Sequence, residues 1–372
     1  MFSDIYKGKK VLITGDTGFK GSWLALWLLE LGAEVYGYSL SPEKDEDNYV
    51  VCGLENEIKH FDGDVRDLKI LVDYFGKIKP DIIFHLAAQS LVLESYNDPH
   101  ETFATNVMGT VNLFEAVRLT PSVKVAINVT SDKCYKNNEW IWGYRENDPM
   151  GGKDPYSASK GASEIITSSY MSSFFTKEGT ANIASVRAGN VIGAGDWAEN
   201  RIIPDYFRAK KSNTELVIRN PNATRPWQHV LEPLSGYMHL ASELYNVGKT
   251  FQGGWNFGPR DTMNRTVAEL IEEIVKHDSN TDVVYGNSGD NLEANLLKLD
   301  ISKAVSQLNW MPVLDFEETL KYTIEGYLSD LDGNSAIGDR LKTIESYTEA
   351  AKKPKNFLSS KLEFFSVKKN IV

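Results

Sequence analysis

The sequence predicts an α/β protein built on a doubly wound parallel sheet, followed by a smaller α/β layer. Short apolar segments alternate with helical segments over about the first 190 residues. Each of these segments is apolar at nearly every position, as strands buried on both faces are. The alternation stops after about Gly189, where Gly, Pro, Asn and Trp become frequent. Alternating strands and helices indicate a parallel sheet with helices on both faces, and the later change of composition indicates a second domain.

The individual elements follow from the same pattern. Expected strands of the sheet are residues 10–14, 34–40, 82–86, 123–129 and 182–187, with residues 251–259 as a returning strand. Expected helices include residues 22–31, 106–119 and the amphipathic segment 264–277. We expect residues 1–187 and 230–262 to form the sheet domain, residues 188–229 and 263–351 the smaller domain, and Lys-rich residues 352–372 a tail.

Composition excludes several classes of protein. The 372 residues carry a net charge of −11, which argues against a general nucleic-acid binder because phosphate binding needs a basic surface. Two cysteines, Cys52 and Cys134, do not make a disulfide scaffold and suggest a reducing cytoplasm; Cys134 is expected to be a small filler. The six histidines show no metal-ligand spacing, so no metal is expected.

No segment suggests a signal peptide or a membrane anchor. The N-terminal residues lack an apolar region behind a basic start. The densest apolar run, residues 23–32, is about half the roughly 20 residues that a membrane span needs. We therefore expect a buried helix there, and a cytoplasmic protein without a membrane partner.

A glycine-rich loop joins the first strand to the first helix. Gly15, Gly18 and Gly21 have a GxxGxxG spacing in the segment GDTGFKG. Such a loop lets the backbone approach a pyrophosphate and directs helix N-terminal N–H groups at it. A glycine triplet alone is weak, but its position between a strand and a helix favours dinucleotide binding over a simple turn.

The usual test for NAD against NADP does not decide here. An Asp or Glu normally ends the second strand and binds the ribose 2′-hydroxyl. This strand ends in Tyr38-Ser39-Leu40, and Glu34 lies at its start. The later Asp64 is a candidate acceptor for the adenine amino group, with an ordinary turn as the alternative.

Tyr156 and Lys160 form a candidate proton-transfer pair. They follow Asp154-Pro155, a good helix start, and their i,i+4 spacing places them on one helical face. An ammonium beside a phenol lowers its pKa, so such a tyrosine can take a proton from an alcohol. Tyr6 and Lys10 have the same spacing in no meaningful context, so the spacing alone carries little weight.

A second candidate group directly follows the strand at residues 123–129. Ligands of parallel sheets bind beyond the carboxyl ends of the strands, where this segment lies. Ser131 is then a candidate to bind the reacting hydroxyl, Asp132 a general acid, and Lys133 a charge or a base. The alternative is a surface ion pair between Asp132 and Lys133.

At this point the sequence resembles the CDP-glucose 4,6-dehydratases, extended short-chain dehydrogenase/reductases with a Rossmann-type sheet. The resemblance covers residues 10–328, and its most specific parts are FKGSWL, TSDKCY and RPWQHVLEP. It implies a lyase of deoxysugar biosynthesis for the cell-surface O-antigen of lipopolysaccharide. It further implies NAD as cofactor, CDP-glucose or a similar nucleotide sugar as substrate, and a homodimer formed by a four-helix bundle that includes the Tyr156 helix.

The resemblance also implies a mechanism. NAD⁺ oxidises C4 while Tyr156 takes the hydroxyl proton, water leaves across C5 and C6 with Asp132 as acid, and hydride returns to C6. The related dTDP-glucose dehydratases have Asp-Glu where this chain has Asp132-Lys133, which leaves open the group that removes the C5 proton. Tyr156 and Lys160 would also contact the cofactor.

Further residues take binding roles by this resemblance. For the cofactor they are Gly15, Gly18, Phe19, Gly21, Asp64, Val65, Leu86, Ala87, Ala88 and Gln89. For the nucleotide sugar they are Asn190, Arg201, Arg225 and Arg260, since an arginine fork suits a pyrophosphate; surface ion pairs are the alternative. His229 is expected to be structural.

Asp16 departs from the family, which usually has His at this position. A carboxylate beside a pyrophosphate is repulsive unless it points away or caps the helix. The sequence therefore predicts weak retention of NAD.

Two other functions remain as alternatives. One is a dehydratase or 4-epimerase acting on another nucleotide sugar, although an epimerase needs no acid such as Asp132. The other is a non-catalytic dinucleotide sensor, against which the presence of both Tyr156 and Lys160 counts.

Overall fold

The computed structural model describes residues 2–353 apart from 219, 261–263, 279–280 and 287–295. The expected tail, residues 352–372, lies almost wholly outside the described residues. The main sheet has six parallel strands in the order β10-β5-β4-β3-β1-β2. They are β1 Lys10–Thr14, β2 Glu34–Tyr38, β3 Ile82–His85, β4 Val125–Val129, β5 Asn182–Ala188 and β10 Gly253–Phe257.

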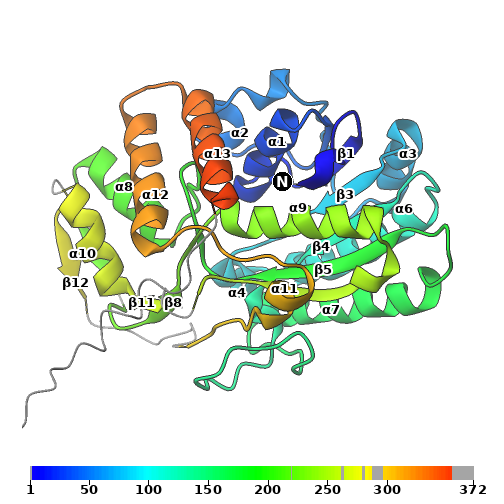
Figure 1. Ribbon diagram of the computed structural model, residues 1–372. Coiled ribbons are helices and arrows are strands. Elements are labelled where there is room, and N and C mark those ends of the chain that lie inside the picture. Colours follow the sequence, from blue (N-terminus) through cyan, green and yellow to red (C-terminus); the bar gives the residue numbers. More distant parts are fainter. Residues whose placement is uncertain (1, 219, 261–263, 279–280, 287–295, 354–372) are drawn as a thin grey trace, which may run out of the picture.

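Helices cover both faces of this sheet, which confirms the predicted doubly wound α/β class (Figure 1). Alternation of side chains along a strand explains the two cores: Val11 and Ile13 point to one face and Leu12 to the other. The first face packs against α1 Phe19–Glu30, α9 Leu231–Asn246 and α13 Ala336–Lys352. The second packs against α3 Leu68–Ile78, α6 Gly109–Arg118 and α7 Pro155–Phe174.

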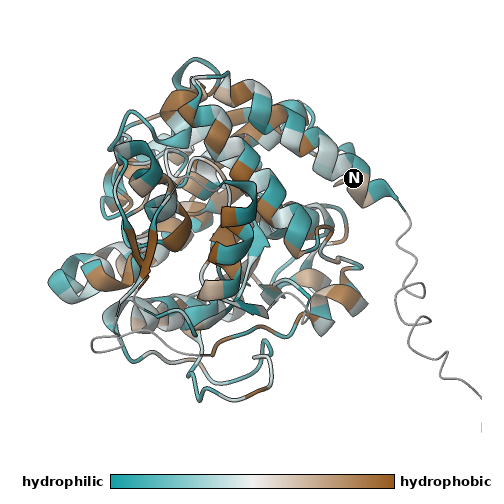
Figure 2. Cartoon of the chain, turned by 90° about the vertical axis from the view of Figure 1, so that its left-hand side faces the viewer, coloured by the Kyte–Doolittle hydropathy of each residue, from teal (hydrophilic) through white to brown (hydrophobic). Residues whose placement is uncertain are grey.

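A smaller layer lies beside the sheet, with a core of its own that includes Trp197, Tyr206 and Ile271. Figure 2 looks onto this layer, whose helices carry both hydrophilic and hydrophobic residues, as helices packed on one side do. Its helices are α8 Ile202–Ser212, α10 Val267–His277 and α12 Phe316–Leu331, whereas α11 Ser302–Gln307 packs against β10 of the main sheet. Its strands pair as β6 Val191–Ile192 with β9 Gln228–His229, β7 Leu216–Ile218 with β12 Val283–Tyr285, and β8 Thr224–Pro226 with β11 Asn264–Thr266.

Short helices complete the chain. They are η1 Phe2–Asp4, α2 Asn48–Val51, η2 Leu54–Asn56, α4 Val92–Asn97, α5 Pro99–Phe103, the π-helical η3 Ala104–Met108, η4 Asp132–Cys134 and η5 Lys249–Phe251. Among the described residues, no helix combines the length and apolar character needed to cross a membrane.

Candidate active site

The glycine loop after β1 has the geometry that its spacing predicts. Gly15 has a φ of +78°, and a Cβ there would lie 2.7 Å from the backbone nitrogen of Ala87. A Cβ on Gly21 would lie 2.0 Å from the Gly15 carbonyl oxygen. Gly18 caps α1, whose first residue is Phe19. The loop is thus pressed against the segment after β3, with the N-terminus of α1 directly behind it.

Asp16 points away from this helix terminus. Its carboxylate is fully buried, with Oδ1 accepting a hydrogen bond from Ser39 Oγ at 2.9 Å. Oδ2 lies 2.7 Å from Nδ1 of His60. This hydrogen bond to Asp16 raises the pKa of His60. The carboxylate thus has two partners on the side of β2, and the expected weak retention of NAD stays a prediction.

The segment after β3 was predicted to line the nicotinamide side of the site. Leu86, Ala87, Ala88 and Gln89 are all half-buried there. Leu86 N–H donates to the Thr14 carbonyl at 2.9 Å, which holds the segment next to the glycine loop. Gln89 is fixed by its side-chain amide, which donates to Thr102 Oγ1 at 2.8 Å.

The predicted adenine contacts lie near the other edge of this site. Asp64 binds Arg66, with Oδ2 at 2.6 Å from the guanidinium, and this hydrogen bond lowers the pKa of the carboxyl group. Val65 is buried, and its carbonyl accepts a hydrogen bond from Asn112 at 2.9 Å. Asp64 therefore already has a partner, and adenine would share it with Arg66.

Three of the predicted catalytic residues form one cluster. Asp154 caps α7 by accepting from the Ser157 N–H at 2.8 Å, so Tyr156 falls in the first turn as predicted. Ser131 donates to Asp132 Oδ1 at 3.0 Å, and its hydroxyl also acts on the pKa of Tyr156. Asp132 is only 4% exposed, so the alternative of a surface ion pair is wrong.

Burial shifts the pKa values of this cluster. It raises the pKa of Asp132, although the charges of Lys133 and Lys20 oppose it. It also raises the pKa of Tyr156 to about 12, against the hydrogen bond from Ser131. The prediction of a lowered tyrosine pKa is therefore wrong for the protein without ligands. The Lys160 ammonium donates to the Val129 carbonyl at 3.3 Å.

Lys20 is a residue of the site that the sequence pattern did not predict. It lies in the first turn of α1, and its charge acts on both Asp132 and Lys160. Burial lowers the pKa of Lys20 to about 8, and that of Lys160 to about 8 as well. The position of Lys20 in the first turn of the helix that follows the glycine-rich loop could have indicated that it belongs to the site.

The predicted substrate-binding residues differ in their surroundings, and the charge of one of them acts on this cluster. Arg201 donates to Asp196 at 2.8 Å, and its charge acts on Tyr156. Asn190 lies two residues after β5 and is half-buried. Arg225 is the central residue of β8 and donates to the Thr224 carbonyl at 3.0 Å. Arg260 follows β10 by three residues and donates to the Pro312 carbonyl at 3.3 Å.

Two further residues have surroundings that suit structural roles. His229 is fully buried with its ring edge-on to Trp23 at 5.8 Å, and burial lowers its pKa to about 3. Cys134 is buried as a free thiol. In the described part of the chain, no three His, Cys, Asp or Glu side chains are grouped as they would be around a metal ion.

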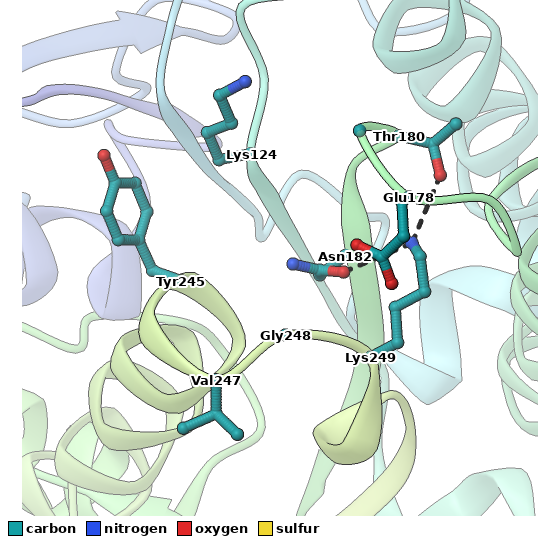
Figure 3. Close-up of a pocket in the computed structure, with 9 residues that line it drawn as sticks. Lys124, Glu178, Thr180, Asn182, Tyr245, Val247, Gly248 and Lys249 are labelled. Carbon is teal, nitrogen blue, oxygen red and sulfur yellow. Dashed lines mark hydrogen bonds between the residues drawn. The ribbon is translucent and has the colours of Figure 1, made fainter.

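A cavity of about 350 Å³ lies at the opposite end of the sheet (Figure 3). Lys124 and Asn182, at the starts of β4 and β5, line it together with Lys249. The Lys249 ammonium already contacts Thr180 Oγ1 at 3.2 Å and Asn182 Oδ1 at 3.3 Å. Because ligands of parallel sheets bind at the carboxyl ends of the strands, this cavity is not the candidate active site.

Comparisons with known proteins show the family of the chain. The family described as GDP-mannose 4,6 dehydratase matches residues 12–323. The CDP-glucose 4,6-dehydratase of Salmonella typhimurium is 46% identical over 353 residues, which are 93% of this chain and 98% of that protein.

Solved structures show the same fold at lower identity. The epimerase Mth375 of Methanothermobacter thermautotrophicus has a TM-score of 0.75 and 24% identity, over 92% of this chain and 96% of that one. The dTDP-glucose 4,6-dehydratase of Bacillus anthracis, solved in complex with NAD, has a TM-score of 0.72 and 20% identity. The match covers 89% of this chain and 100% of that one. With its Rossmann-type sheet and its Ser131-Asp132-Tyr156 cluster, the chain belongs to the nucleotide-sugar 4,6-dehydratases, a family of NAD-dependent hydro-lyases.

Proposed function

We propose that this protein converts CDP-glucose to CDP-4-keto-6-deoxyglucose. The observation that carries the proposal is the 46% identity to a CDP-glucose 4,6-dehydratase along 98% of that protein. The cluster of Ser131, Asp132 and Tyr156 supports it, because dehydration needs an acid for the C6 hydroxyl besides a base for the C4 hydroxyl.

The residues around the glycine loop fit NAD. The close approaches at Gly15 and Gly21 leave only backbone beside the N-terminus of α1, which suits a pyrophosphate. Residues 86–89 would face the nicotinamide, and Lys160 would hold its ribose. When bound, NAD⁺ would supply the redox chemistry, by taking up the hydride from C4 of the sugar and giving it back at C6.

The chain's own groups would move the protons. Tyr156 takes the C4 hydroxyl proton, and Ser131, whose hydroxyl acts on the same phenol, would orient the sugar hydroxyl. Asp132 protonates the departing C6 hydroxyl. The raised pKa of Asp132 favours the protonated form that this step needs.

The smaller layer would hold the nucleotide sugar together with Arg260; of residues 263–351, expected to belong to it, α13 packs on the sheet instead. Asn190 precedes β6, Arg201 precedes α8 and Arg225 lies within β8. Guanidinium groups bind two oxygens of a pyrophosphate at once, so these arginines would fix the CDP moiety while the glucose reaches Tyr156.

We further propose that two copies associate through α4, η3 and α7. Leu93, Tyr96, Met108 and Ile165 expose large apolar side chains on these elements, and Ile165 is 62% exposed. Because α4 and η3 both pack against α7, these exposed apolar side chains lie on neighbouring elements, as at an interface, and a two-fold dimer would bury the same residues on both copies. The free, buried thiols of Cys52 and Cys134 support a reducing, cytoplasmic setting.

The test is a substrate panel. The protein with added NAD is incubated with CDP-, dTDP-, UDP- and GDP-glucose, and the products are identified by mass. Loss of one water from CDP-glucose alone is the expected result. Water loss from another nucleotide sugar would contradict the substrate, and a C4 epimer of unchanged mass would contradict dehydration.

A further inference from the structure

The end of β2 carries no acid, although a dinucleotide site normally needs one there. In this fold an Asp or Glu at that position binds the 2′-hydroxyl of the adenosine ribose and repels the 2′-phosphate of NADP. Here β2 ends at Tyr38 and continues into Ser39. The inference that follows rests on the proposed binding of a dinucleotide.

The missing carboxylate comes from the glycine loop instead. Residues 37 and 39 point to the same face of β2, because side chains alternate along a strand. On that face a Cβ at Gly37 would lie 2.1 Å from Asp16 Oδ2, so the absent side chain makes room for the carboxylate. Asp16 Oδ1 then lies 2.9 Å from Ser39 Oγ.

The hydrogen bond between them determines what Ser39 can offer a ligand. A serine hydroxyl has one hydrogen to donate and two lone pairs that accept. Ser39 gives its hydrogen to Asp16 at 2.9 Å, which is charged and nearer than its other acceptor, the Leu40 carbonyl at 3.2 Å. The Thr17 N–H donates to Ser39 Oγ at 3.5 Å, and Thr17 Oγ1, 2.9 Å from Ser39 Oγ, can give its own hydrogen to the Leu40 carbonyl, which leaves Ser39 one lone pair. Toward a ribose, Ser39 can therefore accept from a 2′-hydroxyl but has no hydrogen left for a phosphate.

We propose that Asp16, acting directly by its charge and through Ser39, makes the site select NAD over NADP. Asp16 thus takes the part of the acid that usually ends the second strand.

The surrounding charged groups leave this arrangement intact. His60 contacts the other carboxylate oxygen, Oδ2, so it lies away from Ser39. Asp62 binds Nε2 of His60 at 3.3 Å and accepts from Ser41 at 2.6 Å. Tyr49 packs its ring against His60 at 5.6 Å. His60 thus lies between Asp62 and Oδ2 of Asp16. Oδ1 of Asp16, which faces Ser39, remains a hydrogen-bond acceptor.

The test measures dinucleotide binding without turnover. Dissociation constants for NAD and NADP are determined by titration calorimetry for the wild type and for Asp16→Asn, which keeps the shape and removes the charge. Wild type should bind NAD at least about tenfold more tightly than NADP, a difference of about 1.4 kcal/mol. Asp16→Asn should reduce that ratio by roughly tenfold, mainly through tighter binding of NADP.

Two further variants keep the inference open to refutation. Asp62 pairs with Ser39 only through the backbone, while its carboxylate binds Ser41 and His60, so Asp62→Asn should leave the ratio unchanged. Asp16→Asn combined with Ser39→Asp moves the carboxylate to the strand end and should restore the preference for NAD.

An unchanged ratio in Asp16→Asn, or an equal effect of Asp62→Asn, would overturn the role of Asp16. A wild type that prefers NADP would do the same. A wild type that binds neither dinucleotide would instead overturn the proposed function.

Discussion

The hydroxyl of Thr130 donates a hydrogen bond to the carboxylate of Glu164, although the two residues are 34 positions apart. Thr130 directly precedes Ser131, and Glu164 lies one helical turn after Lys160. This bond therefore joins the two halves of the catalytic cluster, the end of β4 and the helix α7. The Arg187 guanidinium holds the same carboxylate at 2.9 and 2.7 Å.

The bond between Thr130 and Glu164 makes Thr130 a positioning residue. Thr130→Val keeps the shape of the side chain and removes the donor, so the distance between Ser131 and Tyr156 loses a constraint. We expect kcat to fall by about tenfold with little change in KM. Thr130→Ser keeps the donor and should retain most of the activity. Equal losses in both variants would contradict a role for the hydrogen bond.

The pair of Glu164 and Arg187 is buried, with both side chains 4% exposed. Removing one partner leaves an uncompensated charge in the core, which costs about 3–5 kcal/mol. Arg187→Met should lower the free energy of unfolding in urea by this order. Arg118→Met, which breaks the exposed pair with Glu115, should leave it nearly unchanged. Similar effects of the two substitutions would refute the importance of burial.

Tyr156 is the proposed base for the C4 hydroxyl. Tyr156→Phe removes the phenolic oxygen and keeps the ring, so turnover should be lost while CDP-glucose still binds. Single-turnover assays would measure the loss of turnover, and calorimetry would measure the binding of CDP-glucose. Turnover at roughly a tenth of wild type or better would show that another group takes the proton.

The contact between His60 and Asp16 predicts a pH dependence of stability. The pKa of His60 is raised in the folded protein above its unfolded value of about 6.5. The stabilisation is therefore complete below pH 6.5 and is lost as the pH rises through the folded pKa. The difference in free energy of unfolding between wild type and His60→Asn should shrink over that range. A difference independent of pH would contradict the ion pair.

The apolar surface on α4, η3 and α7 predicts a dimer that one charge can break. Ile165→Glu places a carboxylate in the centre of that surface, and light scattering should then report a monomer. Val217→Glu changes an exposed apolar residue of the smaller layer, 55% exposed, and should leave the dimer intact. A monomeric wild type would contradict the proposed association.

Local patterns predicted which elements exist better than where they end. The strand expected at residues 34–40 stops at Tyr38, and the helix expected from residue 22 begins at Phe19. The segment 264–277 opens with three residues of strand, because Thr266 caps α10 through a capping box with Glu269. Ends depend on caps and on neighbouring strands, which a periodic pattern does not contain.

In the site, too, local spacing predicted some features and missed those that depend on tertiary packing. Spacing along α7 placed Tyr156 correctly, and the same i,i+4 argument applied once more to Lys160 would have found Glu164. The contact of Asp16 with His60 joins residues 44 positions apart and depends on tertiary packing. The direction of the Tyr156 pKa shift was wrong because spacing does not report how deeply a phenol is buried.

The position of β10 has a consequence for biosynthesis. This strand completes the sheet at the edge beside β5, yet β6 to β9 and α8 and α9 separate the two in the chain. A ribosome therefore exposes β5 as an open, hydrogen-bonding edge until residue 257 has emerged, and such edges invite intermolecular pairing. Closure of this edge is the last step of sheet formation, so chains that terminate early in β10 should be prone to aggregate.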